Sequence, residues 1–167
     1  MSKSSGLAVL ALIVALGAMG LGVYQIIFVP TPTAPSGVRH TWYDFHYSTV
    51  FTNPVSTIIQ VDQLLINFTV NSGESVYFHF NTWATVDAGV SSVIQLNFVL
   101  DGTWLYGPQH PWCALVSYND SIQVPVSLQM SLDTVTVGAH NVSVSIYGND
   151  ANNNIFSSTL LVQTYIP

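Results

Sequence analysis

Three short segments of the sequence combine residue types that could do acid–base or metal chemistry. Asp44 and His46 share one face of a predicted strand, where a carboxylate and an imidazole could exchange a proton. His110 and Cys113 place an imidazole near a thiol, and residues 148–154, which read GNDANNN, form an oxygen-rich loop that could hold calcium. None of the three is complete, because a zinc site needs three or four protein ligands and a calcium site needs several carboxylates. We therefore expect a structural role for Asp44 and His46, a solvated turn at residues 148–154, and no enzyme activity, metal or cofactor.

Aromatic residues give better candidates for contact with a ligand. The connection 101–112 reads DGTWLYGPQHPW, and its rings combine flat apolar faces with polar edges, which suits stacking on a sugar or anchoring a protein partner. Its candidate contact residues are Trp104, Tyr106, His110 and Trp112. The alternative is that these rings close the open end of a β-sandwich. A second candidate is an outward-facing row that could equally be a subunit interface: Tyr77, His79, Asn81 and Trp83.

The chain has very few charged residues. They make up 6% of its 167 residues, against about 25% in an ordinary soluble protein. The two basic residues are Lys3 and Arg39, and all eight acidic residues follow Arg39. An acidic domain with almost no cation is unsuited to nucleic acid or to an anionic membrane face. Cys113 is the single cysteine, so no intrachain disulfide can form, and it fits a small buried apolar residue.

Ser, Thr, Asn and Gln replace charged residues on the expected surface, which is typical of an exported protein and of one that carries sugars. Three segments match the N-glycosylation pattern, at Asn67, Asn119 and Asn141. A chain rich in these residues also produces such matches by chance. Asn67 and Asn141 fall inside predicted strands and Asn119 falls in a turn, so Asn119 is the best candidate.

Residues 6–29 are predicted to form a transmembrane helix. The segment contains no charged residue, and as a helix it would be about 36 Å long, enough to cross a ~30 Å hydrocarbon core. Lys3 precedes it and the flank after it is uncharged, which favours a cytoplasmic N-terminus, residues 1–5. We therefore expect a single-pass protein of the cell membrane with its C-terminal domain outside. Residues 30–39 contain three prolines and are predicted to be an extended linker.

Two other interpretations of the N-terminal segment remain, a cleaved signal peptide and a pilin-type precursor. The apolar core is longer than that of a usual signal peptide, and the acidic residue found early in bacterial pilins is missing. Small residues in the segment recur at spacings of three and four, which would let two such helices approach closely. These candidates for helix association are Ala8, Ala11, Ala15, Ala18 and Gly22.

Residues 40–167 are predicted to be one all-β domain. Apolar and polar residues alternate with period two, and turn residues recur about every ten positions. In 76–86 every second residue belongs to one face, and in 94–100 Gln95 and Asn97 point outward. Pro125 cannot donate to a ladder, so the strand over 122–130 is expected at an edge or with a bulge. About eight strands fit an antiparallel β-sandwich or jelly roll.

Several short motifs resemble the jelly-roll heads of the complement and tumour-necrosis-factor superfamily. They are VNSGESVYFHF at 70–80, the turn around 100–102, residues 137–140 before a strand, and the closing LLVQTYIP. No collagen-like stalk precedes the domain, unlike the complement type. The resemblance implies a compact homotrimer and carries over no binding residue. The composition also resembles small, poorly charged surface proteins common in archaea.

Three functions are consistent with these features. The first is a membrane-anchored structural protein of the cell surface whose β-sandwich self-associates into a homo-oligomer such as a trimer, or into a surface assembly. The second is a lectin-like or adhesive module that binds carbohydrate or protein through the loop 101–112. The third is a filament subunit in which residues 39–51 insert as a strand into a neighbour's sheet.

Overall fold

A computed structural model describes residues 37–52, 58–88, 91–105 and 110–167 of the chain. The predicted transmembrane helix 6–29 with its small-residue stripe, most of the linker, and Tyr106 lie outside these residues. No helix in the described part is long and apolar enough to cross a membrane.

The described residues form eleven strands and one short 3₁₀ turn, Asp62–Leu64. The strands are β1 (Gly37–His46), β2 (Val50–Phe51), β3 (Ile59–Gln60), β4 (Ile66–Val70), β5 (Ser75–Val86), β6 (Ser92–Leu100), β7 (Thr103–Leu105), β8 (Trp112–Ser117), β9 (Ile122–Leu132), β10 (Gly138–Gly148) and β11 (Asn154–Ile166). β1 begins at Gly37, within the expected linker 30–39.

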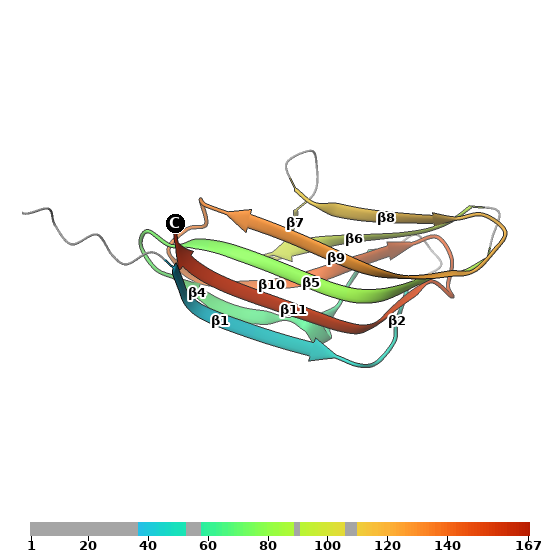
Figure 1. The fold of residues 1–167 in the computed structure, drawn as a ribbon, viewed down its shortest axis with the longest axis horizontal. Coiled ribbons are helices and arrows are strands. Elements are labelled where there is room, and N and C mark those ends of the chain that lie inside the picture. The colour runs from blue at the N-terminus through green and yellow to red at the C-terminus, as the bar shows by residue number, and fades with distance from the viewer. Residues whose placement is uncertain (1–36, 53–57, 89–90, 106–109) are drawn as a thin grey trace, which may run out of the picture. The chain divides into compact units, whose positions relative to one another are not determined.

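The strands form two antiparallel sheets (Figure 1). The five-stranded sheet has the order β1-β11-β5-β9, with β2 also pairing with β11. The six-stranded sheet has the order β3-β10-β6-β7, with β4 also pairing with β10 and β8 with β6. Because β9 is the last strand of its sheet, Pro125 lies at an edge, as the sequence predicts. β1, the segment expected to exchange between copies, pairs with β11 of its own chain.

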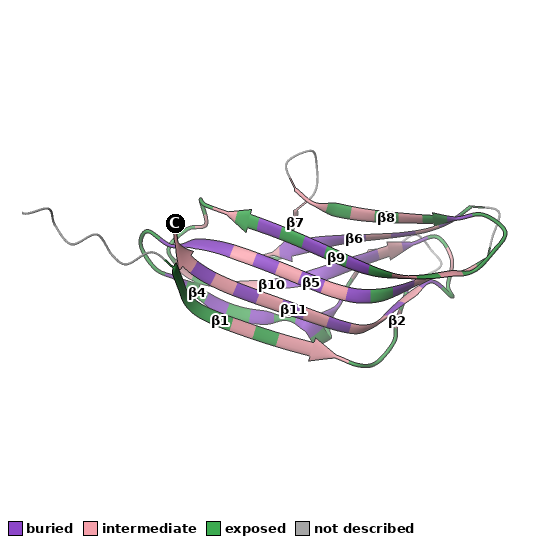
Figure 2. Cartoon of the chain, in the orientation of Figure 1, coloured by how far each residue is buried: buried purple, intermediate pink, exposed green. Residues whose placement is uncertain are grey.

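The core lies between the two sheets and follows the period-two pattern. Purple and lighter residues alternate along β5, β9 and β11 in Figure 2, because one side of each strand faces the opposite sheet. The six alternating residues of 76–86 are all buried, as predicted. Phe78 and Phe98, from opposite sheets, contact each other with ring centroids 5.7 Å apart. The expectation of an antiparallel two-sheet sandwich is confirmed.

The strand count is eleven where about eight were expected, because several strands are interrupted. Residues 37–51 are divided into β1 and β2. Leu64 belongs to the 3₁₀ turn and Leu65 follows it, so β4 begins only at Ile66. The 3₁₀ turn Asp62–Leu64 places the Leu64 side chain in the core, where it is completely buried.

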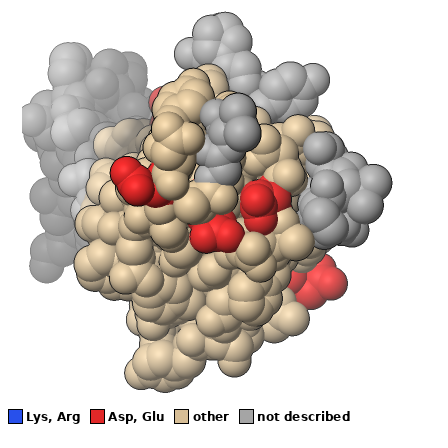
Figure 3. Space-filling model, turned by 90° about the vertical axis from the view of Figure 1, so that its right-hand side faces the viewer, with Lys and Arg blue, Asp and Glu red and all other residues tan. Residues whose placement is uncertain are grey.

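One end of the sandwich is held together by amide side chains. Asn153 is fully buried, and its side chain accepts from Asp87 N and Ser92 Oγ and donates to Val93 O, at 2.8 to 2.9 Å. Asn149 donates to Ser91 O at 2.7 Å. The loop 148–154 was expected to be a solvated turn, but these bonds make it a connector between β10–β11 and β5–β6. Figure 3 views this end, where the coloured side chains in view are acidic.

Candidate functional site

β7 and β8 occupy one position beside β6, and this arrangement brings two tryptophans together. Trp104 of β7 lies opposite Val99 of β6, and Trp112 of β8 lies opposite Asn97. The two positions are two residues apart along β6, so both indoles are on the same outer face of the sheet, roughly 7 Å apart along the strand. Both are substantially exposed, Trp104 at 40% and Trp112 at 53%. Two of the four predicted ligand-contact residues therefore belong to one surface.

A cavity of about 180 Å³ opens beside Trp104 on this face. Its walls come from four strands or their flanks and contain aromatic rings, amides and one aliphatic side chain: Ile58, Gln95, Asn97, Trp104 and Tyr147. Gln95 and Tyr147 are cross-strand partners in β6 and β10, which fixes the amide beside the phenol ring. None of these described lining residues carries a charged side chain.

Asn97 gives the cavity its main polar feature. The residue is only 5% exposed, although it points to the outer side of the sheet. Its Oδ1 atom is buried and has no hydrogen-bond partner within the described part of the protein. Such an orphaned acceptor costs about 1–3 kcal/mol and is uncommon in folded proteins. The wall of the cavity therefore includes an amide whose buried acceptor receives no donor from the described residues.

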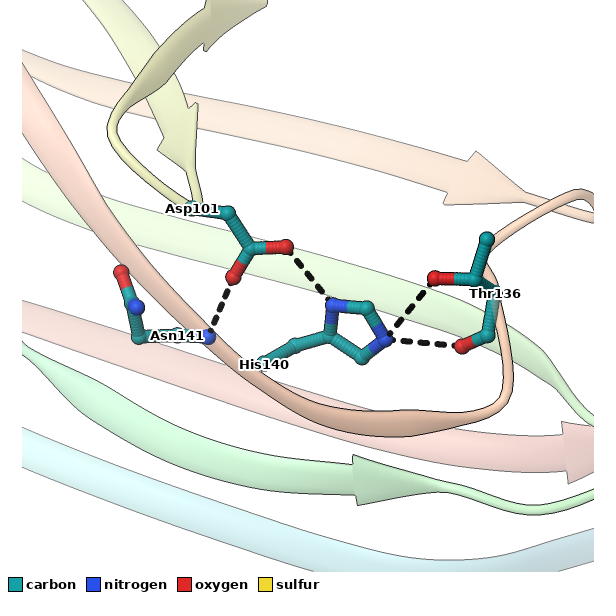
Figure 4. A network of polar contacts seen from close by, with 4 residues as sticks. All are labelled: Asp101, Thr136, His140 and Asn141. Carbon is teal, nitrogen blue, oxygen red and sulfur yellow. Dashed lines mark hydrogen bonds and ion pairs between the residues drawn. The ribbon is translucent and has the colours of Figure 1, made fainter.

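The hairpin that carries Trp104 is fixed by an ion pair at its turn (Figure 4). His140 Nδ1 donates to Asp101 Oδ2 and His140 Nε2 donates to Thr136 O, each at 2.7 Å. Asp101 Oδ1 accepts from Asn141 N at 2.9 Å. Because both acceptors lack a proton, the geometry needs a proton on each ring nitrogen, which is the imidazolium form. Asp101 has a φ of 49°, so the pair also holds a left-handed turn residue.

The electrostatics agree with this geometry. The hydrogen bond from His140 to the Asp101 carboxylate raises the pKa of His140, and the Thr136 carbonyl adds to the effect against the opposing influence of burial. For Asp101, burial raises the pKa, but the hydrogen bonds from His140 and Asn141 N outweigh it and the pKa is lowered. Both groups are therefore charged over a shared pH interval.

His110 is the other predicted contact residue that the structure describes. His110 is half-buried and precedes β8. Asn97, Gln95 and Tyr147 were not predicted as site residues. Alternation gave the outward side for Gln95 and Asn97, and the pairing of β6 with β10 and with β8, which the sequence does not reveal, was needed to assemble the cavity.

The segments considered for chemistry have structural roles in the described residues. Asp44 Oδ1 accepts from the neighbouring Phe45 N at 2.8 Å, and no hydrogen bond in the described structure joins it to His46. Cys113 faces the core, next to the outward Trp112, and burial raises the pKa of its thiol. A raised pKa opposes formation of the nucleophilic thiolate. No group of three His, Cys, Asp or Glu among the described residues could hold a metal ion.

The glycosylation candidates differ in their surroundings. Asn119 lies in the exposed β8–β9 turn with a φ of 69°. Asn67 and Asn141 are direct cross-strand partners of β4 and β10. Thr69, the hydroxyl residue of the first motif, is exposed, whereas Ser143, that of the third, is fully buried.

No protein-family model matches the sequence, and no curated protein is significantly similar to it. Among solved structures the chain is similar to the VP2 subviral particle of infectious bursal disease virus, with 13% identity and a TM-score of 0.44 over 74% of this chain and 32% of that chain. It is also similar to the carbohydrate-binding module CBM36 in complex with calcium and xylotriose, with 10% identity and a TM-score of 0.38 over 75% and 91%. A family 35 carbohydrate-binding module from Clostridium thermocellum gives 10% identity and a TM-score of 0.28 over 77% and 98%.

The likeness at these TM-scores is loose, and the chain spans about a third of the VP2 chain. The three structures are a capsid protein and two binding modules. The resemblance to the complement and tumour-necrosis-factor superfamily stays a prediction.

Proposed function

We propose that the β-sandwich is a lectin-like module that binds a neutral sugar in the cavity beside Trp104. The observation that carries the proposal is a cavity lined by Trp104 and Tyr147 whose wall also contains Asn97, with a buried Oδ1 atom that has no partner among the described residues. A pyranose has an apolar C–H face and a rim of hydroxyls. The face can stack on an indole ring, and a hydroxyl can donate to the orphaned acceptor.

The lining also supports a choice of sugar class. Gln95 and Asn97 supply amide groups that can both donate and accept, which matches hydroxyls better than carboxylates. The lining residues that the structure describes include no cation to pair with an acidic sugar. Neutral hexoses and pentoses are therefore favoured over uronic acids.

The test is isothermal titration of the full-length chain in detergent with four neutral oligosaccharides: cellohexaose, xylohexaose, mannohexaose and maltohexaose. Trp104→Ala is expected to weaken the binding of at least one of them by about 2 kcal/mol or more, roughly thirtyfold. Val116→Ala is the matched control, because Val116 is exposed on the same outer face of β8 and lies opposite Val93, away from the cavity. Unchanged binding in a folded Trp104→Ala variant, or no binding by the wild type, contradicts the proposal.

We also propose that residues 6–29 anchor this module in the cell membrane with residues 40–167 outside. The uncharged segment and the single preceding Lys3 support this placement. After expression in bacterial cells, the chain should stay in the membrane pellet through an alkaline wash. Protease added to spheroplasts should remove the β-sandwich. Release into the soluble fraction would contradict anchoring.

Self-association is the second candidate function, and a specific observation favours it. Aromatic side chains at the β1–β2 border of the five-stranded sheet are unusually exposed, Tyr43 at 62% and Phe51 at 55%. They lie opposite Leu161 and Asn154, seven positions apart along β11, so exposed apolar surface extends along this border, and such surface marks association sites. Light scattering of the full-length chain in detergent should show a discrete oligomer that Tyr43→Ser with Phe51→Ser converts to a monomer. A monomeric wild type would exclude this function.

A further inference from the structure

A groove of about 360 Å³ lies on the other face of the sandwich, on the outside of the five-stranded sheet. Residues of β5, β9 and β11 line it, and none of them is charged: Asn81, Thr82, Trp83, Pro125, Val126, Ser127, Ser157 and Thr159. Trp83 is 44% exposed within a strand that is otherwise mostly buried. The groove is separate from the Trp104 cavity, which belongs to the six-stranded sheet.

Two neighbouring rows cross the strands at the groove. The first row is apolar, with Trp83 paired to Phe156 on one side and to Pro125 on the other. The Trp83 and Phe156 rings are nearly parallel, at 17°, with centroids 6.4 Å apart. The second row is polar, with Asn81 paired to Thr159 and to Ser127. An apolar strip beside a strip of amide and hydroxyl groups matches the two sides of a pyranose ring.

A β-bulge shapes the polar wall. The β11 register shifts between Phe156 and Thr159, and Ser157 there has a φ of 50°, a conformation that serine rarely adopts. The bulge is fixed from below, because the buried Thr82 and Ser158 hydroxyls are 2.7 Å apart and Thr82 Oγ1 also donates to Phe156 O at 3.1 Å. The result is that Ser157 lines the groove instead of continuing the alternation. Backbone strain held by specific buried bonds is typical of functional positions.

We infer that this groove is a second site for neutral carbohydrate, so that one chain holds two glycan segments on opposite faces of its sandwich. Trp83 and Pro125 receive the apolar face of a sugar ring, with Phe156 supporting the Trp83 ring, and the side chains of Asn81, Ser127 and Ser157 bond its hydroxyls. This inference extends the proposed function to a second surface and does not depend on the first site.

The test follows the indole N–H signals of Trp83 and Trp104 by NMR in the full-length chain in detergent. Trp83→Phe and Trp104→Phe variants identify the two signals. The probes are the same four hexaoses. At least one hexaose should shift the Trp83 signal in the wild type and equally in Trp104→Ala. Asn81→Ala should weaken that response about tenfold, as the loss of an amide that bonds the ligand requires. Tyr77→Ala is the control, since Tyr77 is on the same face of β5 but roughly 20 Å from Trp83.

The outcomes separate the two sites. A Trp83 signal that no hexaose moves overturns the second site and leaves the Trp104 proposal standing. A Trp83 response with an unresponsive Trp104 supports the groove and contradicts the proposed function at the first cavity. If dilution of the protein shifts the Trp83 signal while hexaoses do not, a second copy of the chain occupies the groove and the inference is wrong.

Discussion

His140 Nδ1 lies 2.7 Å from Asp101 Oδ2, and this pair joins the start of β10 to the turn from which β7 and Trp104 extend. The His140 side chain is 8% exposed and that of Asp101 is 45% exposed. The imidazole therefore carries the buried side of the interaction, and its protonation state determines whether the turn is held.

The pair should make stability depend on pH. His140 has a raised folded pKa, so its contribution is complete below the ordinary value of 6.5 and is lost as pH rises through the folded pKa. Asp101 has a lowered pKa, so its contribution is present above the ordinary 3.8 and is lost as pH falls through the folded pKa. Urea unfolding of wild type and His140→Gln should differ most between about pH 4 and 6.5, and the difference should shrink as pH rises through the raised folded pKa of His140. A difference that does not change with pH would contradict an imidazolium at this position.

Asn153 should be the most sensitive loop residue. Replacing it by alanine leaves Asp87 N and Ser92 Oγ without this acceptor, removes one of the two donors to Val93 O, and should cost about 3 kcal/mol or more. Asn152→Ala, the neighbouring control, loses exposed bonds, including the one to Asp87 Oδ2, and should cost less than about 1 kcal/mol. Equal costs in urea unfolding would show that the loop is not a structural connector.

Substitution of Asn97 by leucine should keep or raise the free energy of unfolding and should abolish ligand binding. Asn97→Leu removes the orphaned acceptor, so the free energy of unfolding should stay the same or rise by up to about 1 kcal/mol. The same substitution should abolish titration of the cavity with the hexaoses. If Asn97→Leu destabilises the protein by several kcal/mol, the amide has a structural role and the acceptor is not reserved for a ligand.

The three glycosylation motifs should differ in occupancy. Asn67 and Asn141 are cross-strand partners with Cβ atoms about 5 Å apart, so a glycan on one leaves no room for a glycan on the other. Asn119 is in an exposed turn and should be the most occupied. Mass spectrometry of the chain from a host that N-glycosylates exported proteins should find at most one glycan on the pair. Molecules that carry both would contradict this.

The period-two pattern predicted most of the fold. It assigned the buried face of β5 and the outward side of Asn97, and the lack of a donor at Pro125 predicted the edge position of β9. These features are local, because alternation depends only on which side of a strand faces the other sheet.

The candidate site could be predicted only in part. Trp104 was recognised by its residue type, but its approach to Trp112 requires β7 and β8 to share one position beside β6. The burial of Asn97 at 5% on an outward face depends on side chains from other strands. Alternation assigns faces and not neighbours, so neither feature could be read from the sequence.

The division of the edge strands into short pieces affects how neighbouring copies of the chain can pair through their sheets. Exposed sheet edges invite pairing with another chain, and proteins commonly protect them with lysine, yet this chain has two basic residues in all. Here the border positions are divided between β1 and β2, β3 and β4, and β7 and β8, while β9 carries Pro125. Among the described borders, β2, β3, β4, β7 and β8 are short and β9 carries Pro125, whereas β1 is an edge strand of ten residues with one register shift between Val38 and His40. Copies packed densely on a surface should therefore have β1 as their main edge for pairing, and the other borders should keep them discrete.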